Sequence, residues 1–80
     1  MKHYKVVVRW RDAYTIDQWT DIESLQKEPA GKECFTTGYL IYNRKEGVAV
    51  ANTISSDGEA CAVLFIPRSF IKTVEVKAYG

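Results

Sequence analysis

Residues 35–79 have the sequence FTTGYLIYNRKEGVAVANTISSDGEACAVLFIPRSFIKTVEVKAY, and this stretch decides the fold. It contains four apolar runs, bounded by polar or turn-forming residues, at 39–42, 48–51, 60–66 and 71–76. Short runs of β-branched and aromatic residues at such regular spacing are typical of an antiparallel sandwich or barrel. The pair Asp57-Gly58 is a strong hairpin signal between two of these runs. The stretch therefore predicts a mainly β fold.

The first third of the chain adds one more strand. Residues 5–11 alternate, so that Val6, Val8 and Trp10 share one face while basic residues lie mainly on the other. We expect the outward basic row to be a solvated face. The other strands are predicted at 33–43, 48–54, 59–66 and 71–76, with a tight turn at 68–70. Gly38 is expected to bulge or bend the second strand, as a small barrel requires in order to close.

Residues 12–31 break the rhythm of the strands and form an insertion. Thr20 and Glu23 fit a capping box, which predicts a short helix that ends before Pro29. We expect this helix to pack over an open end of the sheet, with Tyr14 and Trp19 as an apolar plug. The chain is thus predicted to be a single domain, residues 1–80. Its expected fold is a small five-stranded, strongly bent antiparallel barrel with one short helix between strands 1 and 2.

The composition limits the classes of function. The chain has 80 residues, 46% hydrophobic and 26% charged, as an ordinary globular domain has. A formal net charge of +1 argues against a protein that coats duplex nucleic acid through bulk charge. No apolar stretch approaches a membrane span and the start does not resemble a signal peptide, so we expect a cytoplasmic protein and no membrane partner.

The sequence offers no set of catalytic or metal-binding residues. His3 is the single histidine, and neither Cys34 nor Cys61 has a local partner for nucleophilic chemistry. Both thiols are expected to be buried or half-buried and reduced. The carboxylates are expected in turns or at the helix cap, and there is no glycine-rich phosphate loop. We therefore expect a binding protein, not an enzyme, with no cofactor and no metal.

Two segments carry a resemblance to a known family. The first contains Gly38, Leu40 and Asn43 followed by the alternating Val48 and Val50, and the second is residues 66–74, IPRSFIKTV. Together they resemble the two motifs of the Sm/LSm proteins and cover about half of the chain. Two features depart from that pattern: the helix lies between the first two strands, and Pro67-Arg68 replaces the usual Arg-Gly. An Ile-Pro corner also occurs in Src-homology-type peptide-binding barrels. The whole is similar to short proteins of bacterial viruses and prophages.

The Sm resemblance implies a homo-oligomeric ring of Sm-like barrels. In such a ring the fourth strand of one subunit pairs with the fifth strand of the next, and two loops face the pore. Val63, Phe65, Val74 and Val76 would then belong either to the core or to the seam. Binding of single-stranded RNA or nucleotides needs cations for phosphates and flat groups for bases. The loop residues that would supply these groups are Tyr42, Asn43, Arg44, Lys45, Arg68 and Ser69.

Two other functions fit the sequence. A viral oligomer of this kind would act as a sponge that sequesters a host nucleotide signal between subunits, with Trp10, Arg11 and Trp19 near the ligand. A peptide- or protein-interaction module would instead use an aromatic groove or an exposed edge strand. The residues expected to matter for such a module are Tyr14, Trp19, Phe70 and Tyr79.

Overall fold

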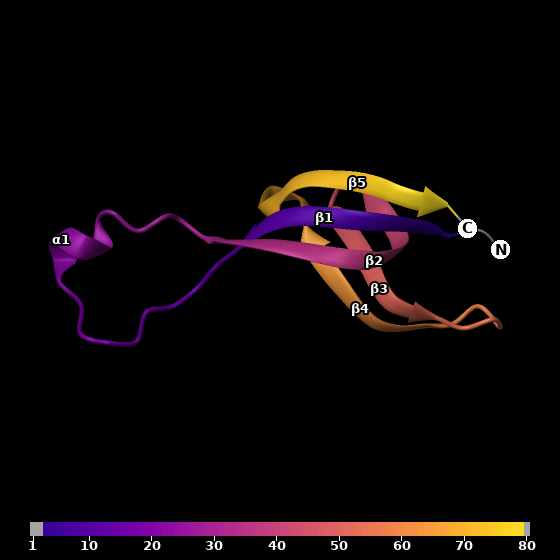
Figure 1. Ribbon diagram of the computed structural model, residues 1–80, viewed down its shortest axis with the longest axis horizontal. Coiled ribbons are helices and arrows are strands. Elements are labelled where there is room, and N and C mark those ends of the chain that lie inside the picture. The colour runs from indigo at the N-terminus through magenta and orange to yellow at the C-terminus, as the bar shows by residue number, and fades with distance from the viewer. Residues whose placement is uncertain (1–2, 80) are drawn as a thin grey trace.

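A computed structural model describes residues 3–79 as one five-stranded antiparallel sheet with a long arm between its first two strands (Figure 1). The strand order is β4-β3-β2-β1-β5. The elements are β1 (Tyr4–Asp12), α1 (Ile22–Leu25), β2 (Lys32–Arg44), β3 (Gly47–Ile54), β4 (Ala60–Pro67), the 3-10 turn η1 (Arg68–Phe70) and β5 (Ile71–Tyr79). The mainly β prediction, with one short helix between strands 1 and 2, is confirmed.

The five strands lie where the apolar runs predict them, and most are one to three residues longer than predicted. The predicted turns are also present. Gly58 has a φ of 89°, which a side chain would strain, and the Ser55 N–H donates to the carbonyl of Glu59 at 2.8 Å. Pro67 ends β4, and η1 then turns the chain into β5. The local signals therefore suffice to place the elements.

The prediction of a strongly bent barrel is wrong, because the sheet is neither closed nor strongly curled. β4 and β5 are its two edges, and in residues 3–79 neither pairs with the other. Closure of a small sheet requires tilted strands with a staggered register, and bulges help by bending single strands. Here the register shifts fall at two places in the β1–β5 pairing and at one place, between Leu40 and Tyr42, in the β2–β3 pairing. The pairings of β1 with β2 and of β3 with β4 run without a shift.

The bulge expected at Gly38 is absent from the pairing of β1 with β2. The pairing of Gly38 with Val6 continues the β1–β2 register without a shift. The residue is required for another reason: a Cβ there would lie 2.4 Å from the carbonyl oxygen of Ala51 and 2.8 Å from Cγ1 of Val50. The glycine thus lets β2 and β3 approach closely over the core.

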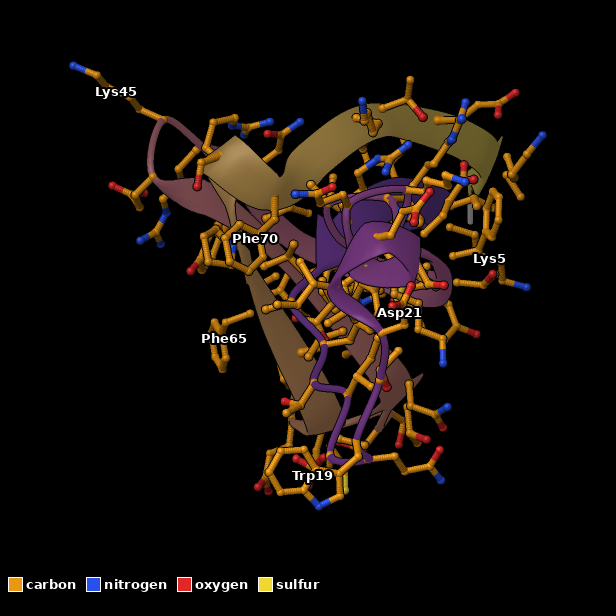
Figure 2. All side chains as sticks on the ribbon, turned by 90° about the vertical axis from the view of Figure 1, so that its left-hand side faces the viewer. Lys5, Trp19, Asp21, Lys45, Phe65 and Phe70 are labelled. Atoms are coloured by element: carbon orange, nitrogen blue, oxygen red, sulfur yellow. The ribbon has the colours of Figure 1, made fainter. Side chains whose placement is uncertain are left out.

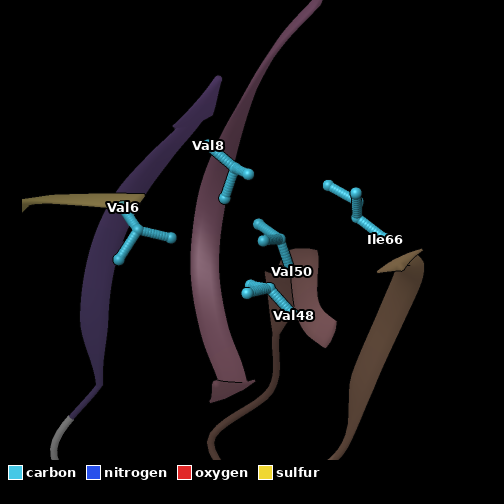
Figure 3. Packing of buried hydrophobic residues seen from close by; sticks show 5 residues of the cluster. All are labelled: Val6, Val8, Val48, Val50 and Ile66. Carbon is cyan, nitrogen blue, oxygen red and sulfur yellow. The ribbon is translucent and has the colours of Figure 1, made fainter. Parts of the chain in front are cut away.

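A small apolar core forms on one face of the sheet. Val6 and Val8 of β1 point toward Val48 and Val50 of β3 and toward Ile66 of β4 (Figure 3). All five are at most 2% exposed, and Trp10, Leu40, Ile71 and Val74 pack against them. The predicted alternation in β1 is confirmed, because Val6 and Val8 are buried while Lys5 and Arg9 are exposed.

The two edges of the sheet differ in chemistry. The sequence of β4, ACAVLFIP, has no charged residue, and Cys61, Ala62, Leu64 and Phe65 are exposed. Charged side chains protect β5, where Lys77 and Glu75 form an ion pair at 3.0 Å. Of the four residues predicted for core or seam, Val74 packs on the core, whereas Phe65 and Val76 are more than half exposed. The exposure of Cys61 also corrects its predicted burial, while Cys34 is half-buried as expected.

The insertion does not cover the sheet, which is a second correction. Residues 13–31, called the arm below, project from one end of a molecule that measures 53 × 21 × 20 Å (Figure 1). The β1–β2 pairing runs as far as Asp12 and Lys32 and holds the base of the arm away from the core. Trp19, the predicted plug, is fully exposed, and Tyr14 is 41% exposed.

The helix in the arm is shorter than predicted and begins differently. Asp21, not Thr20, is the N-cap, and its carboxylate accepts from the Ser24 N–H at 3.0 Å. Thr20 instead donates its hydroxyl to the carbonyl of Gln18 at 3.0 Å. Asp is at least as good an N-cap residue as Thr. The capping-box pattern alone therefore could not predict whether Thr20 or Asp21 would cap the helix.

Candidate functional site

The structure brings the two predicted binding loops together. Arg68, at the start of η1, donates from one guanidinium nitrogen to the side-chain oxygen of Asn43 and, at 2.5 Å, to the backbone carbonyl of Arg44. The Arg68 N–H also donates to the carbonyl of Glu46 at 3.0 Å. The turn between β2 and β3 and the corner before β5 are therefore a single site, which we call the two-loop cluster.

An aromatic pair lies beside this cluster. The Arg44 guanidinium sits 4.0 Å above the ring of Tyr42, a cation–π contact. The Tyr42 ring is 6.3 Å from the ring of Phe65, which is 64% exposed and points away from β4 (Figure 2). A depression of about 200 Å³ is lined by these rings, Glu46 and Pro67. The pairing with Phe65 was not predicted from the sequence.

The other two predicted site residues lie farther from this contact. Lys45 extends into solvent at the tip of the β2–β3 turn (Figure 2). Ser69 lines a different depression, of about 350 Å³, together with Arg11, Phe70 and the base of the arm. The structure thus gathers Tyr42, Asn43, Arg44 and Arg68, and leaves Lys45 and Ser69 at its margins.

Other aromatic side chains lie on the same side of the sheet as Tyr42 and Phe65, which is the side opposite the core. In an antiparallel pair, directly opposed residues share a face, and Lys5 opposes Tyr39 while Arg9 opposes Phe35. The Lys5 ammonium lies 5.6 Å from the centre of the Tyr39 ring. Tyr39 and Tyr42 both reach this face because the register shift between Leu40 and Tyr42 adds one residue. We call this surface the aromatic face; its rings are Phe35, Tyr39, Tyr42 and Phe65.

The aromatic face carries an excess of cations. Lys5, Arg9 and Arg11 project from β1 by the same alternation, and Arg44 joins them from β2. Glu33 partly offsets this charge through an ion pair with Arg9. Such an exposed pair contributes little to stability, so Arg9 can exchange Glu33 for another anion at small cost. Phe35 beside it is 66% exposed.

A separate apolar cavity of about 400 Å³ lies at the end of the sheet away from the arm. Tyr4, Leu40, Ile41, Ile54 and Ala60 supply most of its lining. His3 and Glu59 add polar groups at its edge, and the His3 ring meets Tyr39 edge-on at 6.4 Å. Its apolar lining suits a hydrophobic group better than a phosphate.

In residues 3–79 no group of three or more His, Cys, Asp or Glu is placed to hold a metal ion. Within the same part of the chain, no helix has the length and apolar character to cross a membrane. Comparison of the chain with protein-family models, curated proteins and solved structures finds no match.

Sequence reasoning did not group the rings and cations of the aromatic face, except for Tyr42 and Arg44. A signal for the face was present in the alternation of 5–11 and in the aromatic spacing of 35, 39 and 42. The basic row was expected to be solvated, since the sequence did not show which strand would lie next to β1. The side chain of Tyr79, named for the peptide-binding alternative, lies outside the described part of the chain.

Proposed function

We propose that the protein is a non-enzymatic binding protein for single-stranded RNA or nucleotides. The observation that carries the proposal is the pair of cation–π contacts on the side of the sheet opposite the core, Arg44 over Tyr42 and Lys5 over Tyr39. Proteins that bind single strands combine cations that follow the backbone with rings on which bases stack. The aromatic face and the two-loop cluster together offer both kinds of group.

Stacking would begin at the most exposed rings. Phe35 and Phe65 are each more than 60% exposed, so a base gains apolar contact there without displacing a protein side chain. At Tyr42 the Arg44 guanidinium already covers one ring face. Arg44 therefore serves either as a lid over that ring or, once displaced, as a phosphate ligand. Arg68 holds the turn that carries both residues.

The same proposal includes a homo-oligomer, as the Sm resemblance implies. Its support is that β4 and β5 are the sheet edges and that β4 exposes an uncharged apolar strand. Unpaired edges of this kind are commonly covered by pairing with another chain. A ring formed by β4–β5 pairing would repeat the aromatic face around its circumference and so strengthen weak single-site contacts.

The proposal is tested with fluorescent oligouridylate, titrated at several salt concentrations. Removal of one cation that binds a phosphate should reduce the slope of log K against log salt by about 0.7. We expect Arg44→Ala and Lys45→Ala each to reduce the slope in this way, with Lys27→Ala as the control that removes a cation from the arm. Phe35→Ala should weaken binding by about 1–3 kcal/mol, roughly 5- to 150-fold, without altering the slope.

Other results would point elsewhere. If the protein binds a mononucleotide tightly but does not bind the oligouridylate, the nucleotide-sponge alternative is favoured. If the protein binds neither the mononucleotide nor the oligouridylate at low salt, the proposal is wrong and the peptide- or protein-interaction module becomes the favoured function. A stable fold in each variant, checked by circular dichroism, keeps these outcomes separate from unfolding.

A further inference from the structure

The depression at the base of the arm, which we call the basal site, gathers side chains from two distant segments of the chain. Arg11 and Asp12 belong to β1, Ser69 and Phe70 belong to η1, and residues 13, 30 and 31 complete the lining. Its volume of about 350 Å³ is within the range of ligand-binding sites, about 300–1,000 Å³.

The pairing of the strands explains why these segments meet. β5 begins at the arm end of the sheet and pairs with β1 no farther than Trp10, which lies opposite Ile71 (Figure 1). The next residue of β1, Arg11, therefore has β2 on one side and η1 on the other. The stem of Arg11 also runs past Gly31, where an added Cβ would lie 3.4 Å from its Cβ and 3.8 Å from its Cδ. Arg11 is thus placed between the turn and the base of the arm.

The Arg11 guanidinium has no acidic partner in the described part of the chain. Glu33 lies directly opposite Arg11 in the β1–β2 pairing, but its carboxylate is bound to Arg9. Asp12 accepts the N–H of Ala13 at 2.9 Å and forms no ion pair with Arg11. Arg11 is nevertheless half-buried, and a charge that is partly removed from water gains from an anion beside it. The basal site therefore holds a cation that is free to bind one.

The four side chains match the parts of a ribonucleotide that ends in a phosphate monoester. A guanidinium such as that of Arg11 binds a phosphate through paired N–H groups, and the Ser69 hydroxyl adds one donor. The ring of Phe70 is 37% exposed and offers a surface on which a base can stack. Asp12 would repel a bare phosphate, but the carboxylate oxygen that is not bound to Ala13 can accept from a ribose hydroxyl. The set favours a nucleotide over inorganic phosphate.

We propose that the basal site binds a ribonucleoside monophosphate, either free or as the phosphorylated end of an RNA strand. Arg11 and Ser69 hold the phosphate, Phe70 stacks on the base and Asp12 binds the ribose. The choice of a nucleotide rests on the proposed function, whereas the site itself is separate from the rings of the aromatic face. A strand that lies on that face would end here, because Arg11 continues the basic row of β1.

Isothermal titration calorimetry with uridine 5′-monophosphate, uridine and inorganic phosphate tests the ligand class. Uridine should bind at least about tenfold more weakly than the monophosphate, because hydrogen bonds to charged groups are the strong ones. Arg11→Gln should weaken binding of the monophosphate by a similar factor and leave binding of uridine unchanged. Lys77→Gln is the matched control, since it removes the same charge near the far end of β5.

Two milder variants guard against an effect on folding. Arg11→Lys keeps the charge and loses the paired donors, so it should weaken binding of the monophosphate less than Arg11→Gln does. Ser69→Ala removes one exposed hydroxyl and should also weaken it. Circular dichroism checks that each variant keeps the fold of the unchanged protein.

Oligouridylates with and without a terminal phosphate, at either end, distinguish the two sources of the ligand. If the strand end is the ligand, the terminal phosphate should tighten binding, and Arg11→Gln should abolish the gain. If the free mononucleotide is the ligand, the terminal phosphate should add nothing, while the monophosphate still binds through Arg11. Both results support the basal site.

Three results would overturn the proposal. Inorganic phosphate that binds as tightly as the monophosphate would show an adventitious anion only. Binding of the monophosphate that falls in Arg44→Gln but not in Arg11→Gln would place the nucleotide on the aromatic face. A monophosphate that does not bind at low salt would leave the basal site without this ligand.

The proposed function is tested separately, by the oligouridylate that lacks a terminal phosphate. If this oligouridylate binds and the monophosphate does not, the basal site is wrong while the proposed function stands. If the monophosphate binds through Arg11 and the oligouridylate does not bind, the basal site stands while RNA binding by the aromatic face is wrong.

Discussion

Replacement of Gly38 by alanine tests the account of how β2 and β3 pack. An ideal Cβ at this position lies 2.4 Å from the Ala51 carbonyl oxygen and 2.8 Å from Cγ1 of Val50. Carbon–oxygen contacts between strands are normally about 3.3–3.6 Å, so the strands must separate by roughly 1 Å. Ala51 and Val50 are buried, and the core offers no room to absorb that shift.

The expected cost of Gly38→Ala follows from overpacking a well-packed core, about 1–3 kcal/mol. For a domain of this size, each kcal/mol lowers Tm by about 4–8 °C. A loss of about 2 kcal/mol would thus lower Tm by roughly 8–16 °C. Differential scanning calorimetry measures it, with Thr37→Ala as the control, because Thr37 is the next residue and is exposed. A Tm within about 2 °C of the unchanged protein would show that the close approach of β2 and β3 is not as described.

Three further predictions concern the core and the arm. Ile66→Ala should reduce the free energy of unfolding by about 2–5 kcal/mol in urea titrations, because Ile66 is 2% exposed at the centre of the core. Asp21→Ala removes the N-cap of α1, which should destabilise the helix by about 0.5–2 kcal/mol. Proteases should therefore cleave the arm faster, while the Tm of the sheet stays unchanged. Partial desolvation and then the Glu28 carboxylate raise the pKa of Tyr14 above 10.0, so its contribution to arm order should hold below pH 10 and be lost above it. Spectrophotometric titration, compared with Tyr14→Phe, measures that pKa.

The fold could be predicted as far as its local signals extend. Apolar alternation and turn chemistry placed each strand, and the Pro67 corner was placed correctly before β5. Whether the sheet closes depends on where the register shifts fall. Those shifts occur within apolar runs such as 39–42, where the sequence shows no break. Gly38 was a misleading sign of a bulge, because the close approach of β2 to β3 also requires a glycine there.

The candidate site was partly predictable for a similar reason. Asn43, Arg44 and Arg68 were grouped from two separate loops, and the structure joins them through hydrogen bonds. Phe35 and Lys5 were not grouped with them. Their place on one face follows from the pairing of β1 with the middle of β2, a long-range register that spacing along the chain does not encode.

The arm shows why apolar content alone does not predict burial. Trp19 and Ile22 have the hydrophobicity of core residues, yet both are exposed, and Trp19 does not form the plug that the sequence predicts. The charge of the sequence neighbours distinguishes these residues from the core. The buried valines of β1 and β3 lie in apolar runs, whereas carboxylates lie next to the apolar residues of the arm in the sequence. A buried carboxylate without a partner is costly, so an apolar group in such a setting is better suited to an interface, where a basic surface can pair with the acids.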